Sequence, residues 1–234
     1  MRLHRFFIDE AIGSKKEVLV ASPELANQIS RVFRLKRGDR VILFDGSGSD
    51  YESEVTEASK GSVLFRVLSA THSRYMPERK IYLCAAVVKK DNFELIVEKA
   101  TELGVTDIVP VLAEHSEKKS LNEGRLKKIA IEASEQSGRG DVPRICAIKS
   151  LEEALSSLVE VDSIVFHTEG NSFERQNVTR SDDIAIFIGP EGGWSRNELD
   201  LFHKNKIPVV CLGPQVLRAE TAVVAALSQV VFAA

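Results

Sequence analysis

The chain has 234 residues, of which 44% are hydrophobic and 28% charged, and its formal net charge is −3; this composition excludes a disordered chain and is typical of a folded globular protein. The longest apolar stretch runs only from Ile81 to Val88, and no long apolar segment follows Met1. This pattern excludes a transmembrane helix of about 20 residues and a secretory signal, so we expect a cytoplasmic protein.

Residues 1–73 have the pattern of a small β-rich domain with one helix. Ser22 followed by Pro23 is typical of a helix N-terminus, and we expect a helix from there toward Phe33. Three strands separated by turn residues are predicted to follow: 40–44, 51–58 and 62–68. Short strands at this spacing favour a small barrel.

Basic side chains are concentrated after the expected helix. Five of them fall within ten residues, against the single acid Asp39: Arg31, Arg34, Lys36, Arg37 and Arg40. Clustered lysine and arginine neutralise phosphates, so a local basic stripe indicates a nucleic acid partner even in a chain of negative net charge. A solvated helix end of the same composition is the alternative, and charge alone does not separate the two.

From residue 74 to residue 234 the pattern changes to alternating strands and helices, which predicts an α/β domain with a parallel sheet. The expected strands are 81–88, 108–112, 163–166, 184–188 and 209–212, and the expected helices are 93–103, 126–133 and 151–158. The stretch from Ala222 onward is apolar on all sides, so a helix there is expected to be buried in the core or against a second subunit.

The three cysteines and five histidines show none of the spacings of zinc or redox motifs, and we expect no metal site. The chemistry is instead expected in the loops after the last three strands. The second of these loops begins with Gly189 and Pro190, and Ser195 with Glu198 forms a capping box that predicts a helix start. A glycine-rich turn between a strand and a helix exposes backbone N–H groups to a ligand, although such turns are more often structural. The loop matches neither a dinucleotide-binding motif nor a P-loop, and Glu191 favours a neutral or cationic ligand over a polyphosphate. Glu191, and Glu220 after the next strand, are both expected on the buried side of their loops.

Segments 188–195 and 212–222 resemble the two signature segments of the RsmE family, the 16S ribosomal RNA (uracil-N3)-methyltransferases of the SPOUT superfamily. Further similarities follow in order along the chain, at 5–7, 31–39, 99–105 and 135–139. One departure is Gln215, which stands where the family usually has arginine.

The resemblance implies an α/β fold with two domains: a PUA-like RNA-binding β-barrel at 1–73 and a SPOUT methyltransferase domain with a trefoil knot at 74–234. It also implies a homodimer that acts on 16S rRNA, in the small ribosomal subunit, and that binds S-adenosyl-L-methionine in the knot. The cofactor residues that it implies are Phe166, His167, Thr168, Ile188, Gly189, Pro190, Glu191, Gly192, Gly193, Leu212, Gly213, Val216, Leu217 and Arg218.

Within this framework the sequence suggests roles for individual side chains. Arg218 is expected to stabilise the charge that develops on uracil O2 or O4 as N3 loses its proton, and a salt bridge to Glu220 or Glu191 is the alternative. Glu220 is a possible general base, and Arg139 is expected to contact the target nucleotide unless it caps a helix end. The expected RNA contacts are Arg5, Arg31, Arg34, Lys36 and Arg37.

Two other functions remain open from the sequence. One is a SPOUT enzyme that methylates another RNA position, such as a ribose 2′-hydroxyl of transfer RNA. The other is a non-catalytic rRNA-binding assembly factor that has kept the fold.

Overall fold

The structure is a computed structural model that describes residues 3–117, 119–173 and 183–231. Contacts divide the chain into two compact units. Unit 1 comprises Met1–Met76 and Ser134–Val142, and unit 2 comprises Pro77–Ala133 and Pro143–Ala234. The sequence predicts a single domain boundary, after residue 73. In the structure the later segment Ser134–Val142 also belongs to the N-terminal unit.

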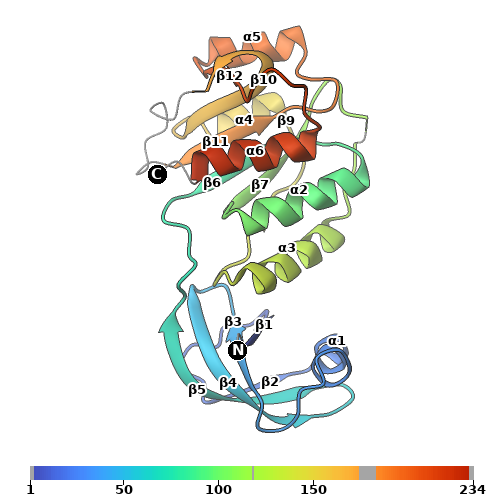
Figure 1. The fold of residues 1–234 in the computed structure, drawn as a ribbon, viewed down its shortest axis with the longest axis vertical. Helices are drawn as coiled ribbons and strands as arrows, with labels where there is room; N and C mark the ends of the chain where they lie inside the picture. Colours follow the sequence, from blue (N-terminus) through green and yellow to red (C-terminus); the bar gives the residue numbers. More distant parts are fainter. Residues whose placement is uncertain (1–2, 118, 174–182, 232–234) are drawn as a thin grey trace. The chain divides into compact units, whose positions relative to one another are not determined.

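Unit 1 is built on one five-stranded sheet (Figure 1). Its strands are β1 (His4–Phe7), β2 (Glu17–Val20), β3 (Arg40–Phe44), β4 (Ser49–Ala58) and β5 (Val63–His72), in the order β1-β3-β4-β5-β2. Only β1 and β3 pair in parallel. Alternate residues such as Phe6, Val41 and Phe65 are buried in its core. The three predicted strands are confirmed, because alternation of apolar and polar residues is a strong local signal.

The helix predicted after Ser22 is confirmed only in its first half. Helix α1 (Pro23–Asn27) begins at Ser22, whose hydroxyl accepts a 3.2 Å hydrogen bond from the Leu25 N–H. The chain then widens into the π-helical turn η1 (Gln28–Val32). This wider turn keeps Ile29 in the core while Arg31 and Val32 remain exposed.

The segment Ser134–Val142 is fastened to β1 by side chains buried in unit 1. Arg5 forms two hydrogen bonds with Asp50 at 2.7 and 2.8 Å, and donates a third to the Arg139 carbonyl at 2.8 Å. The Arg139 guanidinium is only 4% exposed and binds the Asp141 carboxylate through two hydrogen bonds, at 2.9 and 2.8 Å. Arg5 and Arg139 therefore have structural roles inside unit 1, instead of the contacts with RNA and with the target that the sequence predicts.

Unit 2 contains a parallel sheet with helices packed on it (Figure 1). The strands run in the order β12-β10-β11-β6-β7-β8, with β9 also pairing with β7. Their bounds are β6 (Ile81–Ala86), β7 (Asp107–Leu112), β8 (Arg144–Ile145), β9 (Lys149–Ser150), β10 (Asp162–Ser172), β11 (Ile184–Ile188) and β12 (Val209–Cys211). The helices are α2 (Lys90–Glu102), α3 (Glu123–Ser137), α4 (Leu151–Ser157), α5 (Arg196–Lys204) and α6 (Ala219–Val231). The predicted α/β alternation is confirmed.

Strand β10 is longer than the predicted 163–166, and it pairs with β12 twice. Phe166 lies beside Val210 in the register, and after an irregularity Asn171 lies beside the same residue. Gly170 makes this close return possible, since a Cβ on it would lie 2.6 Å from the Val210 Cα. The trefoil knot that the resemblance implies stays a prediction.

Helix α6 packs beside α2 over the sheet (Figure 1). The side chains of Val223, Ala226, Leu227 and Val230 are buried, which accounts for most of the apolar character of this segment. Val224 is partly exposed. Among the residues that the structure describes, no helix is both long and apolar enough to cross a membrane.

Candidate active site

A cavity of about 340 Å³ lies in unit 2 at the carboxyl ends of β11 and β12 and beside residues 166–169 of β10, so the first of the three expected loops is part of a strand. In open parallel sheets ligands bind beyond the carboxyl ends of the strands, so this is the expected place for a site. Thirteen of the fourteen predicted cofactor residues line the cavity, and Arg218 is the exception. The lining residues that sequence reasoning missed are Glu169, Trp194, Gln215, Ala219 and Ala222.

The loop from Gly189 to Trp194 forms one wall of the cavity. It turns back on itself through a 2.8 Å hydrogen bond from the Gly193 N–H to the Pro190 carbonyl, and Gly193 has φ +71°, a conformation that favours glycine. A Cβ on Gly189 would lie 3.2 Å from Nε1 of Trp194, and one on Gly192 would lie 3.1 Å from Cβ of His115. These two glycines therefore serve close packing within the protein, and both also line the cavity.

The start of α5 anchors this wall. The predicted capping box is confirmed: the Ser195 hydroxyl accepts from the Glu198 N–H, and Oε2 of Glu198 accepts from the Ser195 N–H at 2.7 Å. Oε1 of Glu198 accepts from the Glu114 N–H at 2.9 Å, a contact that the sequence pattern does not reveal. Glu198 is buried and so joins the glycine-rich wall to the loop that follows β7.

Two histidines flank Gly193. Nδ1 of His115 lies 3.0 Å from the Gly193 carbonyl oxygen, and Nε2 of His167 faces its α-carbon. Nδ1 of His167 accepts a hydrogen bond from the Glu169 N–H at 3.2 Å. No spacing motif identified His115, because its partner lies on a distant loop.

The two acids expected on the buried side of the cavity differ in their surroundings. Glu191 is exposed at the rim, where Oε1 accepts a 3.4 Å hydrogen bond from Asn92, so the expectation that it is buried is wrong. Glu220 is half-buried in the first turn of α6, and its Oε2 has no partner among the described residues.

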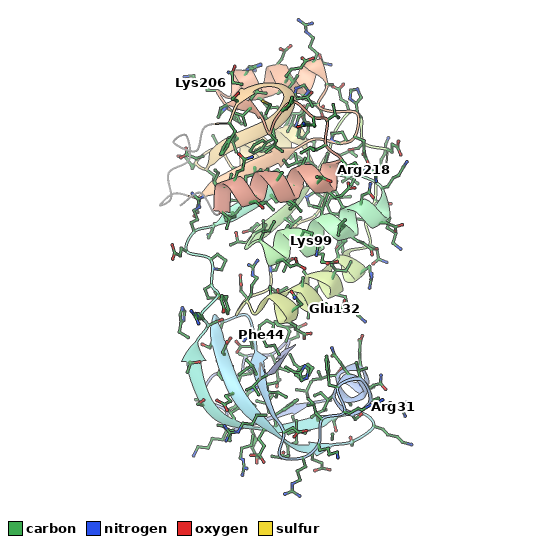
Figure 2. The ribbon with its side chains drawn as sticks, in the orientation of Figure 1. Arg31, Phe44, Lys99, Glu132, Lys206 and Arg218 are labelled. Carbon is green, nitrogen blue, oxygen red and sulfur yellow. The ribbon has the colours of Figure 1, made fainter. Side chains whose placement is uncertain are left out.

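Arg218 is exposed and lies directly before α6 (Figure 2). Its carbonyl accepts the first hydrogen bond of that helix, from the Ala222 N–H at 2.8 Å. Its neighbours Leu217 and Ala219 both line the cavity. In the described part of the chain it forms no ion pair with Glu191 or Glu220, so neither predicted salt bridge is present.

Two cysteines of unit 2, Cys84 and Cys146, are not activated nucleophiles. Cys84 is fully buried, and burial raises the pKa of its thiol; burial also raises the pKa of the half-buried Cys146. A raised pKa leaves less of the reactive thiolate at neutral pH. Within the described ranges, no group of three or more metal-ligating side chains is placed to hold an ion.

The basic stripe of unit 1 lies at the surface. Its predicted RNA contacts are all exposed, and none forms an ion pair with another described residue: Arg31, Arg34, Lys36 and Arg37. Arg40 differs, since it pairs with Glu52 at 2.8 Å. Figure 2 marks Arg31 on the short helical segment that begins the stripe.

Comparison with known proteins agrees with both units. Residues 76–231 match the family described as an RNA methyltransferase domain, and residues 29–68 match an RNA methyltransferase PUA domain. The ribosomal RNA small subunit methyltransferase E of Synechocystis sp. is 31% identical over 213 residues, covering 86% of this chain and 69% of the relative. That of Rickettsia conorii is 29% identical over 237 residues, covering 98% of this chain and 96% of the relative.

Solved structures show the same similarity. A methyltransferase of Legionella pneumophila in complex with its cofactor SAM has a TM-score of 0.89 at 27% identity, covering 100% of this chain and 98% of that one. The ribosomal RNA small subunit methyltransferase E of Neisseria gonorrhoeae, bound to S-adenosyl methionine, has a TM-score of 0.87 at 26% identity, covering 97% of this chain and 96% of that one. The chain described here therefore belongs to the ribosomal RNA small subunit methyltransferase E family.

Proposed function

We propose that this chain methylates N3 of a specific uridine in 16S ribosomal RNA, with S-adenosylmethionine as the methyl donor. The observation that carries the proposal is one cavity lined by all three segments that were expected to hold the cofactor, residues 166–168 within β10 and the loops after β11 and β12. As a homodimer working on the small ribosomal subunit, the protein would act in the cytoplasm. The exposed Val224 on α6 is consistent with a second subunit there.

The residues of the cavity suit S-adenosylmethionine. The N–H and carbonyl groups of the turns at Gly189 and Gly213 can form hydrogen bonds with the edge of an adenine, and Phe166 and Leu217 provide apolar surface. Glu191 at the rim attracts a positive charge. The cofactor, when bound, supplies a methyl group on an activated sulfonium. Nε1 of Trp194, which lines the cavity, is a buried donor without a partner among the described residues, which fits a ligand or water that can accept a hydrogen bond.

The side chains around the cavity then have limited chemistry to perform. The uracil N3 proton must leave, and the nitrogen must be held in line with the methyl group; such alignment contributes about 7–11 kcal/mol. Arg218 at the start of α6 provides a fixed cation for the negative charge that spreads to O2 and O4. Glu220, two residues further, is placed to accept a proton or a hydrogen bond. Arg139 is left out of the catalytic set because its guanidinium is buried against Asp141.

The first expected result concerns the cofactor. Isothermal titration calorimetry should show that S-adenosylmethionine and S-adenosylhomocysteine bind with one site per chain, and that NAD and ATP do not. Trp194 is the sole tryptophan of the chain and lines the cavity, so its fluorescence should change on binding. Binding of ATP in place of S-adenosylmethionine would contradict the proposal.

The second expected result concerns the basic stripe in unit 1. Changing Arg34 and Arg37 together to Glu should weaken binding of 16S rRNA fragments and lower the log–log salt slope by about 0.7–0.9 per lost phosphate contact. The matched control reverses Lys16 and Lys60, two exposed lysines outside the stripe. If both double variants change the salt dependence equally, the stripe is a solvated surface and not a specific RNA contact.

The substrate is identified by mapping modified nucleosides. RNA from a strain lacking the protein should have lost one N3-methyluridine from 16S rRNA, and the wild-type chain should restore it. Loss of a ribose 2′-O-methyl group from transfer RNA would favour the first alternative function. Unchanged RNA together with a ribosome assembly defect would favour the second, a non-catalytic assembly factor.

A further inference from the structure

We propose that His115, in the loop after β7, is a positioning residue that holds the glycine-rich wall of the cavity in its binding conformation. The proposal rests on the proposed function only for the choice of ligand in its test. The wall is the segment Gly189–Trp194, and the contact that carries the inference is the 3.0 Å approach of His115 Nδ1 to the Gly193 carbonyl oxygen.

The chemistry of that contact fixes the role of the imidazole. A carbonyl oxygen only accepts hydrogen bonds, so Nδ1 of His115 must carry the hydrogen and donate. His167 is in the opposite state: its Nδ1 accepts from the Glu169 N–H, so its neutral ring carries the hydrogen on Nε2. His115 therefore acts on the wall from outside, while His167 presents a donor within the cavity that it lines.

The wall needs such an external contact because of its composition. Gly189, Gly192 and Gly193 are three of its six residues, and glycine has more backbone conformations to lose on ordering than any other residue. The Gly193 N–H is already used in the turn, bound to the Pro190 carbonyl. The Gly193 carbonyl is the remaining backbone polar group of that residue, and His115 fixes its direction.

A second contact makes the loop after β7 a rigid base for His115. Glu198 accepts hydrogen bonds from the Glu114 N–H on this loop and from the Ser195 N–H at the end of the wall. Ser116 closes the loop on itself, with its hydroxyl accepting from the Ala113 N–H at 3.2 Å. His115 thus projects from a segment that is fastened on both sides of it.

Position argues against a catalytic role for His115. It is exposed and does not line the cavity, and its Cβ packs behind Gly192. A residue that preorganises a binding loop changes affinity more than the rate of the chemical step. We therefore expect its loss to appear in the KM for S-adenosylmethionine and not in kcat.

The test compares His115→Ala and His115→Asn with His203→Ala, which removes an exposed histidine on α5 that does not line the cavity. Asparagine places an amide N–H at the position of Nδ1 and keeps the donor. His115→Ala should weaken S-adenosylmethionine binding and raise its KM about threefold to tenfold, the range for one lost hydrogen bond, with kcat within twofold of wild type. His115→Asn should recover most of the affinity, and His203→Ala should match wild type.

Hydrogen–deuterium exchange without ligand provides an independent measurement. The peptide that covers Gly189–Trp194 should exchange faster in His115→Ala than in wild type, and at the wild-type rate in His203→Ala. Wild-type affinity and exchange in His115→Ala would overturn the inference, and so would an equal loss in His115→Asn. Failure of the wild-type protein to bind S-adenosylmethionine would instead contradict the proposed function, while the exchange measurement would still decide the role of His115.

Discussion

Replacing Arg218 with alanine is expected to lower the single-turnover methylation rate by roughly 10²–10³-fold, the range found when one donor to a developing negative charge is removed. Arg218 is exposed and directly precedes α6, and its neighbours in the sequence, Leu217 and Ala219, line the cavity. The affinity for S-adenosylmethionine should change little, because the Arg218 side chain is not part of the cavity lining. The decisive measurement is the single-turnover rate at saturating cofactor, beside the dissociation constant of the cofactor.

Two further variants make this test specific. Arg218→Lys should restore the rate only in part, since a point charge does not reproduce a planar fork that faces two oxygens. Arg196→Ala removes an exposed arginine at the start of another helix, α5, and should leave the rate unchanged. If Arg218→Ala abolishes cofactor binding but retains a normal rate at saturation, Arg218 is a binding residue and the catalytic assignment is wrong.

Replacing Gly170 with alanine is expected to destabilise unit 2 by about 3 kcal/mol, the upper part of the usual range for overpacking. The added methyl group would lie 2.6 Å from the Val210 Cα, and backbone atoms cannot move aside as a flexible side chain can. For a unit of this size the unfolding temperature should fall by about 6–12 °C. Trp194 lies in unit 2, so its fluorescence follows the unfolding of this unit specifically.

The matched control for Gly170 is Gly124→Ala in the same unit, which adds the same methyl group at an ordinary contact distance, 3.7 Å from Oδ1 of Asn122. Neither glycine has a left-handed backbone, so the two variants differ in available space and not in strain. Gly170→Ala should also weaken S-adenosylmethionine binding, because Phe166 and Glu169 on the same strand line the cavity. Equal unfolding temperatures for the two variants would show that β10 and β12 separate at little cost.

Signals with short sequence separation predicted most of the local structure. The capping box at Ser195 and Glu198 needs only four consecutive residues, and the structure has it. The apolar periodicity from Phe93 to Leu103 predicted α2, which ends before Gly104 with φ +89°. The cavity-lining loops after β11 and β12 were found in the same way, because each directly follows an apolar strand, whereas the first expected loop, 166–168, lies within β10.

Predictions about individual side chains were less successful where burial depends on distant segments. Glu191 was expected to be buried, but the loop turns it to the surface beside Asn92. Arg5 was expected to contact RNA, but its guanidinium donates hydrogen bonds to Asp50 and to the Arg139 carbonyl.

The sequence by itself determined the longer strands and helices, the two sequence regions with different patterns and the segments that line the cavity, because periodicity, caps and turns are encoded by neighbouring residues. It did not predict the short strands β1, β2, β8 and β9. Only the tertiary structure decided which residues of distant segments contact one another. Arg5 meets Arg139 across 134 positions, and His115 meets Gly193 across 78. Hydrogen bonds and close packing of this kind depend on distances between segments, which no local pattern specifies. The segment Ser134–Val142 joins unit 1 for the same reason.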